Sequence, residues 1–235
     1  MNIAIIGGSG GIGEAFIGQL LEQKGITAVH ATHHQHEPGL QDPSLHWHRV
    51  DVSKEQDIEA LADELDELDW LNNAAGMLHT PQQGPEKTIR RLEPEFFLHN
   101  IQVNALPTLL LAKHLHGKFK HGRPALFATI SAKVGSIEDN RLGGWYSYRA
   151  SKAALNMGMK TLSIEWQRSL PNVSVIAIHP GTTDTALSKP FQRNVPEHQL
   201  FSPDKTVQQI LDVLSSLKPG DTGRFLAFDG EQLPW

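Results

Sequence analysis

Short runs of apolar and β-branched residues alternate along the chain with longer segments whose apolar residues recur at helical spacing. The short runs predict seven buried strands, at Asn2–Ile6, Thr27–Thr32, His46–Val50, Asp69–Asn73, Ala125–Ser131, Val173–His179 and Arg224–Phe228. The longer segments predict helices at Gly11–Lys24, Lys54–Leu65, Pro94–His116, Trp145–Gln167 and Asp204–Leu217. This alternation predicts an α/β fold, a Rossmann-type doubly wound parallel sheet with helices on both faces.

The 235 residues contain no repeat, low-complexity tract or charge block, so we expect a single domain over residues 1–235. Segments rich in Pro and Gly predict loops at His36–Pro43, Thr80–Pro85 and Leu187–Pro203. The last segment is long for a loop in a compact domain, which favours a mobile lid over irregular surface structure.

Charge and composition narrow the classes of partner. The formal net charge of −5 gives no general attraction to nucleic acid or to an anionic membrane. The absence of cysteine excludes a disulfide scaffold and a thiolate nucleophile. The first residues lack the basic segment of a signal peptide, and no apolar stretch is long enough to span a bilayer. We therefore expect a cytoplasmic protein.

A glycine-rich turn follows the first predicted strand directly and precedes a helix. Glycines at such a turn let the backbone approach a pyrophosphate, which then lies against the helix N-terminus. Two registers fit the run, Gly8-x-Gly10-x-x-Gly13 and Gly7-x-x-x-Gly11-x-Gly13. The turn therefore predicts a dinucleotide site without specifying the reaction.

A tyrosine and a lysine lie one turn apart on the longest predicted helix. Tyr148 and Lys152 are four residues apart and so share one helix face. A phenol is a poor acid–base group at neutral pH, but a nearby ammonium stabilises the phenolate and lowers its pKa. The pair is a candidate proton donor to a carbonyl oxygen. Tyr146 has no lysine at this spacing.

Taken together, these motifs resemble the short-chain dehydrogenase/reductase family over nearly the whole chain. The stretch from Gly135 to Tyr148, with the ending Pro234-Trp235, resembles the subgroup of C-factor and Sniffer-like carbonyl reductases. The resemblance implies a nicotinamide dinucleotide held by residues Gly7, Ser9, Gly11, Ile12, Gly13, Asp51, Val52, Asn73, Ala74, Ala75, Gly76, Pro180, Gly181, Thr182 and Thr185, together with Tyr148 and Lys152. It also implies that Tyr148 is the acid–base group, that Lys152 lowers its pKa and binds the ribose, and that Asn104 helps to hold a water.

The family's catalytic serine is missing from its usual place. The family run Ile-Ser-Ser is Ile130-Ser131-Ala132 here, so Ala132 occupies the serine position. Ser131 or Ser136 could supply the hydroxyl instead, although strand alternation points Ser131 away from the direction of its neighbour. We take Ser131 as the candidate substitute and expect that a hydroxyl survives at the site, because Tyr148, Lys152 and Asn104 are kept.

The end of the second predicted strand bears on the choice of cofactor. Thr32, His33 and His34 stand where an acidic residue would select NAD, and the first carboxylate is Glu37. We therefore expect NADP(H), with NAD possible, and place His33 and His34 near the 2′-phosphate. The histidines at 30, 33, 34 and 36 match no standard metal motif, so we expect no metal site.

The predicted function is NAD(P)(H)-dependent reduction of a small-molecule carbonyl, or oxidation of the alcohol, by hydride transfer. The alternative is a dinucleotide-binding signalling or sensor protein with weak or lost catalysis, which the missing serine favours. Intact Tyr148, Lys152 and Asn104 favour the enzyme. The resemblance also implies a homodimer or homotetramer packed through the tyrosine-bearing helix.

Overall fold

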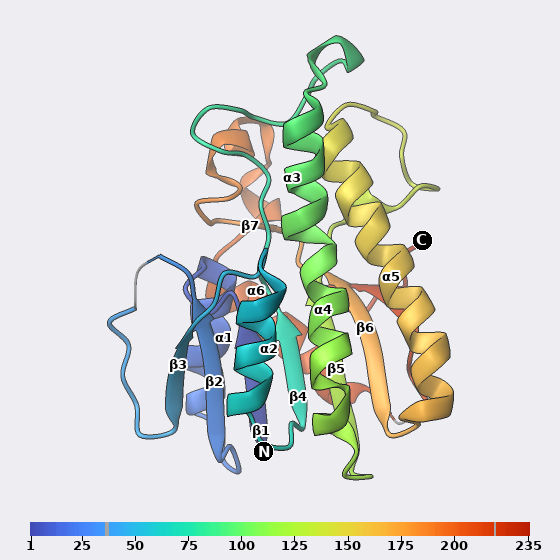
Figure 1. The fold of residues 1–235 in the computed structure, drawn as a ribbon. Coiled ribbons are helices and arrows are strands. Elements are labelled where there is room, and N and C mark those ends of the chain that lie inside the picture. The colour runs from blue at the N-terminus through green and yellow to red at the C-terminus, as the bar shows by residue number, and fades with distance from the viewer. Residues whose placement is uncertain (36–37, 219) are drawn as a thin grey trace.

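The computed structural model describes residues 1–35, 38–218 and 220–235. Its main sheet has seven parallel strands in the order β3-β2-β1-β4-β5-β6-β9 (Figure 1). Every predicted strand is present, and each boundary differs from the prediction by at most one residue. The strands are β1 Asn2–Ile6, β2 Ala28–His33, β3 Leu45–Arg49, β4 Trp70–Asn73, β5 Ala125–Ile130, β6 Val173–His179 and β9 Arg224–Ala227. The predicted doubly wound parallel sheet is confirmed.

Helices cover both faces of this sheet (Figure 1). On one face, buried side chains of α2, α4 and α5 pack on the strands, as Ile58, Leu111 and Leu155 do. On the other face, Phe16 of α1 and Ile210 of α6 do the same. The helices are α1 Gly11–Leu21, α2 Glu55–Glu64, α3 Pro94–Asn104, α4 Leu106–Leu115, α5 Tyr146–Ser169 and α6 Pro203–Ser216. None of these helices is long and apolar enough to cross a membrane.

The single helix predicted over Pro94–His116 was wrong, because the segment forms two helices. α3 ends at Asn104 and α4 begins at Leu106. Pro107, in the first turn of α4, has no amide hydrogen for the carbonyl of Val103, and its ring crowds that carbonyl. Apolar spacing continues through the break, which is why periodicity alone predicted one helix.

The segment Leu187–Pro203 has more structure than the predicted loop. It contains 3-10 helices at Lys189–Asn194 and Glu197–Gln199, and strand β8 (Leu200–Phe201) pairs with β7 (Thr182–Thr183). The predicted loop His36–Pro43 lies partly outside the described residues, since 36 and 37 are not described. Further 3-10 turns lie at Ile89–Arg91, His116–Phe119 and Lys133–Gly135.

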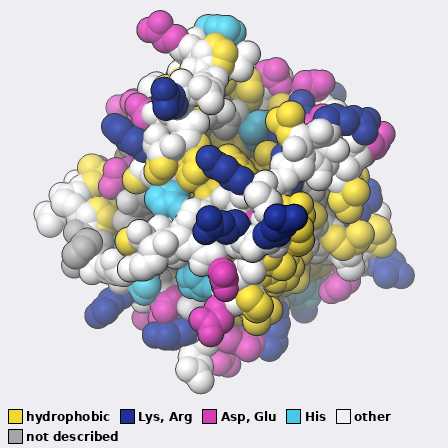
Figure 2. All heavy atoms as spheres, turned by 90° about the horizontal axis from the view of Figure 1, so that it is seen from above, with side chains coloured by type: hydrophobic (Ala, Val, Ile, Leu, Met, Phe, Trp, Pro, Cys, Tyr) yellow, Lys and Arg dark blue, Asp and Glu magenta, His cyan; other side chains and the backbone are white. Residues whose placement is uncertain are grey.

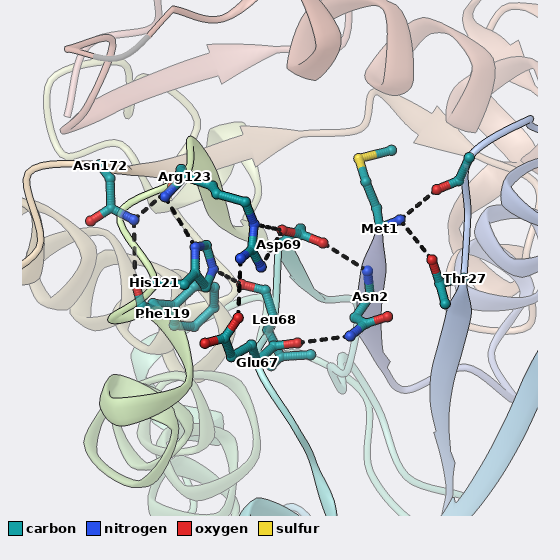
Figure 3. Close-up of polar contacts among 11 residues, drawn as sticks. Met1, Asn2, Thr27, Glu67, Leu68, Asp69, Phe119, His121, Arg123 and Asn172 are labelled. Carbon is teal, nitrogen blue, oxygen red and sulfur yellow. Dashed lines mark hydrogen bonds and ion pairs between the residues drawn. The ribbon is translucent and has the colours of Figure 1, made fainter.

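Polar contacts join the amino ends of the central strands (Figure 3). Arg123 lies 3.1 Å from a Glu67 oxygen and 3.2 Å from Asp69, while the other oxygen of Asp69 accepts from the Asn2 amide at 2.9 Å. Asn172 donates to the carbonyl of Arg123 at 2.8 Å. These contacts connect segments distant in sequence at the end of the sheet where the strands start, which leaves the opposite end for a ligand site.

Candidate active site

The carboxyl ends of the strands form the face seen in Figure 2, where hydrophobic and basic side chains lie together near the centre. The strand order reverses between β1 and β4, and the crevice at such a point is where open α/β sheets bind ligands. Two cavities lie at this end and share Ala75. We name them the glycine-turn cavity, of about 410 Å³, and the tyrosine pocket, of about 250 Å³.

The two cavities collect most of the predicted residues. Those in the wall of the glycine-turn cavity are Gly7, Ser9, His33, His34, Asp51, Val52 and Ala75. Those in the wall of the tyrosine pocket are Ile12, Ala74, Ala75, Gly76, Ser131, Tyr148, Lys152, Pro180, Gly181, Thr182 and Thr185. Four predicted residues line neither cavity, namely Gly11, Gly13, Asn73 and Asn104.

Close backbone approach distinguishes between the two glycine registers. Gly7 has φ +77°, and a Cβ there would lie 2.7 Å from the amide nitrogen of Ala75. A Cβ on Gly13 would lie 2.2 Å from the Gly7 carbonyl oxygen, whereas one on Gly10 would meet nothing nearer than 3.4 Å. Gly7 and Gly13 therefore require glycine and Gly10 does not, which favours the register Gly7-x-x-x-Gly11-x-Gly13.

Gly11 meets the segment after β6. A Cβ on Gly11 would lie 2.9 Å from Cγ2 of Thr185, so the start of α1 and the predicted Thr185 are in close approach. Gly181 in the same segment has φ +73°, a left-handed conformation that glycine adopts freely. The predicted Pro180–Thr185 segment thus reaches back to the glycine turn.

Asp51 and the histidines after β2 face the glycine-turn cavity. Asp51 accepts from the Ser53 hydroxyl at 2.6 Å and lies 3.4 Å from the Lys54 ammonium and 3.6 Å from His34 Nε2. Burial alone would raise the pKa of Asp51, but the hydrogen bonds from Ser53 and Lys54 outweigh it and hold the pKa below its usual range. Asp51 is therefore ionised beside a cavity that also holds His33 and His34.

Asn73 and Asn104 support the cavity walls from behind. Asn73 is buried, accepts from the Ala75 amide at 3.0 Å and donates to Thr108 at 2.8 Å. Asn104 is also buried, and its carboxamide accepts from the Met77 amide at 2.7 Å and donates to the Met77 carbonyl at 2.8 Å. Both side chains hold the chain after β4 in place, where Ala75 and Gly76 line the cavities.

Tyr148 and Lys152 line the tyrosine pocket from the first two turns of α5. The Lys152 ammonium lies 5.9 Å from the centre of the Tyr148 ring and donates to the Ile130 carbonyl at 3.0 Å. Burial raises the pKa of Tyr148 above its ordinary value, contrary to the lowering expected from Lys152, and it lowers the pKa of Lys152 to about 8. At neutral pH the phenol is protonated and most of the lysine is still charged, which suits donation of a proton by Tyr148.

The serines near the pocket are engaged elsewhere. Ser131 donates to Oδ1 of Asn156 on α5 at 2.6 Å, and Ser136 donates to the Trp235 carbonyl at 3.2 Å. Ala132 instead packs in one cluster with Tyr148 and Leu78. The residue beside the tyrosine is therefore the alanine, and the Ser131 hydroxyl hydrogen points to Asn156.

An aromatic wall completes the tyrosine pocket. The Trp145 ring lies 6.2 Å from the Tyr148 ring and 5.2 Å from that of Phe191, both edge-on. Trp145 lines the pocket, whereas Trp235 stacks on Phe225 and does not line it. Sequence reasoning missed Phe191 and His179, which also line the pocket. Phe191 lies in the segment whose short elements carry no periodic signal.

The histidines of β2 and β3 form a cluster of their own at the sheet edge. His30 lies 3.1 Å from His48 between ring nitrogens, and its ring stacks on His46. His36, which belonged to the predicted loop, is not described. Within the described ranges, no group of three potential ligands is arranged to hold a metal ion.

Known proteins are similar to this chain in sequence and in fold. The sequence profile of the short chain dehydrogenase family matches residues 1–196. A 1-hydroxy-2-glutathionyl-2-methyl-3-butene dehydrogenase from a Rhodococcus species is 33% identical over 190 residues, covering 79% of this chain and 78% of that protein. The C-signal protein of Myxococcus xanthus is 31% identical over 133 residues, covering 57% of this chain and 75% of that one.

Two solved structures have the same fold over the whole chain. The carbonyl reductase Sniffer of D. melanogaster superposes with a TM-score of 0.87 at 22% identity, covering 100% of this chain and 99% of that one. An NADPH-bound carbonyl reductase from chicken fatty liver also has a TM-score of 0.87, at 26% identity and with 100% and 94% coverage. The likeness to the C-signal protein agrees with the predicted subgroup. The chain belongs to the short-chain dehydrogenase family and is an NAD(P)-dependent oxidoreductase.

Proposed function

We propose that the protein uses NADP(H) to reduce the carbonyl group of a small apolar molecule, or to oxidise the corresponding alcohol. The observation that carries the proposal is that Tyr148 and Lys152 line the same pocket as the apolar residues Ala132, Trp145 and Phe191. The glycine-turn cavity meets this pocket at Ala75, so a dinucleotide lying along both would bring its nicotinamide to the tyrosine. This arrangement therefore favours an oxidoreductase over a sensor protein.

The chain's own residues would place the substrate and supply a proton. When bound, the dihydronicotinamide supplies a hydride to the carbonyl carbon. Tyr148 gives its hydroxyl proton to the carbonyl oxygen, which becomes the alcohol, and Lys152 stabilises the phenolate that remains. The aromatic wall of Trp145 and Phe191 excludes water from the reacting carbonyl. We propose that Asn104 helps to hold a water for return of the proton, beside the helix break at Ala105.

We further propose that no serine hydroxyl orients the carbonyl in this protein. The Ser131 and Ser136 hydrogen bonds, together with Ala132 beside Tyr148, support this assignment. Tyr148 would then be the main donor to the carbonyl oxygen.

The cofactor preference rests on the end of β2. The Thr32 hydroxyl accepts from the Gly7 amide at 2.8 Å, and His33 and His34 follow it into the glycine-turn cavity. Glu37, the first carboxylate after them, lies outside the described residues. The NADPH-bound carbonyl reductase at 26% identity supports the same choice. We propose NADP(H) as the preferred cofactor.

Three further assignments accompany this function. We propose that residues 1–235 form one NAD(P)-binding domain, because a single sheet includes strands from Asn2 to Ala227. We propose a cytoplasmic location, which cell fractionation would test. We also propose a homodimer or homotetramer that packs through α5, where Met157 and Ile164 are 65% and 51% exposed.

A direct assay tests the proposed function. Oxidation of NADPH should be measured with a panel of aliphatic and aromatic aldehydes, ketones and quinones, beside fluorescence titrations of NADPH and NADH. We expect turnover with apolar aromatic carbonyls and tighter binding of NADPH than of NADH. Binding of NADPH without turnover of any carbonyl or alcohol would contradict the enzyme and favour the sensor. Equal or tighter binding of NADH would contradict the cofactor assignment.

A further inference from the structure

A buried carboxylate lies outside the proposed catalytic group, against the start of the tyrosine-bearing helix. Glu86 belongs to the segment between β4 and α3, and only 2% of it is exposed. One carboxylate oxygen accepts from the Ser147 hydroxyl, and the other accepts from the Ser147 amide at 3.1 Å. Within the described residues, Glu86 makes no ion pair closer than 4.0 Å, so the positive end of the α5 dipole is its compensating charge.

Glu86 also holds the residue before the helix. Its carbonyl oxygen accepts from the Trp145 amide at 2.5 Å, so Glu86 binds the chain on both sides of Tyr146. α5 has no capping side chain of its own, because Trp145 occupies the N-cap position. A helix start leaves amides without partners, and Glu86 satisfies one of them from a distant segment.

The conformation that Glu86 holds is one the chain does not adopt freely. Trp145 has φ +51° and is the only non-glycine residue with positive φ among those described. Gly143 and Gly144 before it are also left-handed, so the chain enters α5 through a left-handed turn. Such a conformation is costly for a bulky residue and persists where surrounding contacts enforce it.

This turn determines the geometry of the tyrosine pocket. Tyr148 is the third residue of α5, and its ring meets the Trp145 ring edge-on at 6.2 Å. The Trp145 ring in turn packs against Phe191. A shift of the first turn of α5 would therefore move the proposed proton donor and the aromatic wall together, while leaving the glycine turn in place.

We propose that Glu86 is a positioning residue for the reaction, which fixes the first turn of α5 and thereby the direction of the Tyr148 hydroxyl. This inference rests on the proposed function, in which Tyr148 donates the proton. Glu86 itself touches neither the tyrosine pocket nor the glycine-turn cavity. Its removal should therefore affect the proton-transfer step more than the binding of the dinucleotide.

The test compares Glu86→Gln with the wild-type protein. Gln keeps the length of the side chain but removes the negative charge that faces the positive end of α5, and its NH₂ group cannot accept from the Ser147 hydroxyl. With 4-nitrobenzaldehyde and NADPH, we expect kcat to fall roughly ten- to a hundredfold, as misplacement of a reacting group by about 1 Å can cause. The Kd of NADPH, measured by fluorescence, should stay within about twofold, since the glycine turn is unchanged.

A matched control and a substrate-free measurement complete the test. Glu93→Gln makes the same charge change at an exposed position of the same segment, where Glu93 makes no capping bond, and should match the wild type. Amide hydrogen exchange of residues 146–149 should quicken in Glu86→Gln alone. This measurement needs no turnover. It therefore still tests whether Glu86 fixes the first turn of α5 if the wild type reduces no carbonyl and the proposed function fails.

The outcomes are distinct. A fall in kcat with unchanged NADPH affinity and faster exchange at the start of α5 supports the positioning role. An unchanged kcat, an equal loss of NADPH binding, or unchanged exchange at residues 146–149 would overturn it. If Glu86→Gln does not fold, Ser147→Ala replaces it, because that change removes only the hydroxyl contact. A smaller fall in kcat at constant NADPH affinity then supports the proposal, and an unchanged kcat refutes it.

Discussion

Burial acts on Tyr148 and Lys152 in the same physical way, by penalising the charged form of each side chain. For the tyrosine this raises the pKa and keeps the proton in place until a carbonyl oxygen takes it. For the lysine it lowers the pKa to about 8, which still leaves most of the ammonium charged at pH 7. The pair therefore favours reduction of the carbonyl at neutral pH. The rate of alcohol oxidation should increase as the pH rises.

At the position of the family serine, restoring the hydroxyl should increase catalysis. Negative charge develops on the carbonyl oxygen, and loss of one donor from such a site usually costs 10²–10³ in kcat, so a new donor beside Tyr148 should raise kcat by about tenfold. We expect this gain in Ala132→Ser, with no change in NADPH affinity. Ser131→Ala should change kcat little, because Ser131 donates to Asn156. Steady-state kinetics in which Ser131→Ala is inactive and Ala132→Ser gains nothing would contradict this account.

The two glycine registers differ in the positions at which a substitution by alanine should destabilise the protein. Gly7→Ala would put a Cβ 2.7 Å from a backbone nitrogen at a left-handed residue, whereas Gly10→Ala meets nothing closer than 3.4 Å. Strain of this kind costs roughly 1–3 kcal/mol, which lowers Tm by several degrees in a chain of this size. Thermal unfolding should show this loss for Gly7→Ala only. A larger loss for Gly10→Ala would favour the other register.

Among the elements, the strands were predictable and the breaks between elements were not. Strands such as β1 and β6 are buried apolar runs bounded by turn residues, and that signal is local. The α3–α4 break depends on Pro107, which a helix tolerates only in its first turn, and the apolar spacing masked it. The short β7–β8 pair has two residues in each strand, too few to show any period.

The histidine cluster on β2 and β3, at the edge of the sheet, should make the stability of the protein depend on pH. Burial lowers the pKa of His30 to about 4, with smaller contributions from His48 and His46, while Asp66 and Glu64 act in the opposite sense. The unfolded chain therefore takes up this proton near pH 6.5 and the folded chain only near pH 4. The contribution of uncharged His30 to the free energy of unfolding is complete above pH 6.5, and it is lost as the pH falls towards 4.

Urea unfolding measures this effect. The free energy of unfolding should fall between pH 7 and pH 5, and the fall should be smaller in His30→Gln. His198→Gln changes an exposed histidine and should keep the wild-type pH dependence. If His30→Gln loses as much stability between these pH values as the wild type does, His30 is not a source of the pH dependence.

For the whole molecule, topology brings the candidate site together from segments far apart in sequence. The glycine turn, the chain after β4, the start of α5 and the segment after β6 all reach the carboxyl end of one sheet. Their motifs are local, so the sequence predicted them. Glu86 and Phe191 carry no motif, because their roles come from the partners they meet in space.

The proposed oligomer depends on the outer face of α4 and α5. Leu109 on α4 is 40% exposed and packs closely enough on Gly158 that a Cβ there would lie 2.9 Å from it. Met157 and Ile164 are seven residues apart and extend this apolar face along α5, which lies beside α3 and α4 in Figure 1. We expect Met157→Lys with Ile164→Lys to yield monomers.

Light scattering coupled to size-exclusion chromatography tests the interface. The double variant should have the mass of one chain, and the wild type twice or four times that mass. Leu142→Lys, at a residue 92% exposed outside this face, is the control and should keep the wild-type mass. A wild-type protein of one chain's mass, or an unchanged mass in the double variant, would contradict the proposed interface.

The proposed reaction depends most on Tyr148, which gives the proton to the carbonyl in a pocket next to the glycine-turn cavity. Tyr148→Phe keeps the ring that packs on Trp145 and removes only the hydroxyl. The most direct test is kcat with NADPH and an aromatic aldehyde, beside the Kd of NADPH. We predict a fall in kcat by roughly 10²–10⁴, as is typical for the loss of an acid–base group, with NADPH affinity unchanged. A kcat near that of the wild type would show that Tyr148 is not the proton donor.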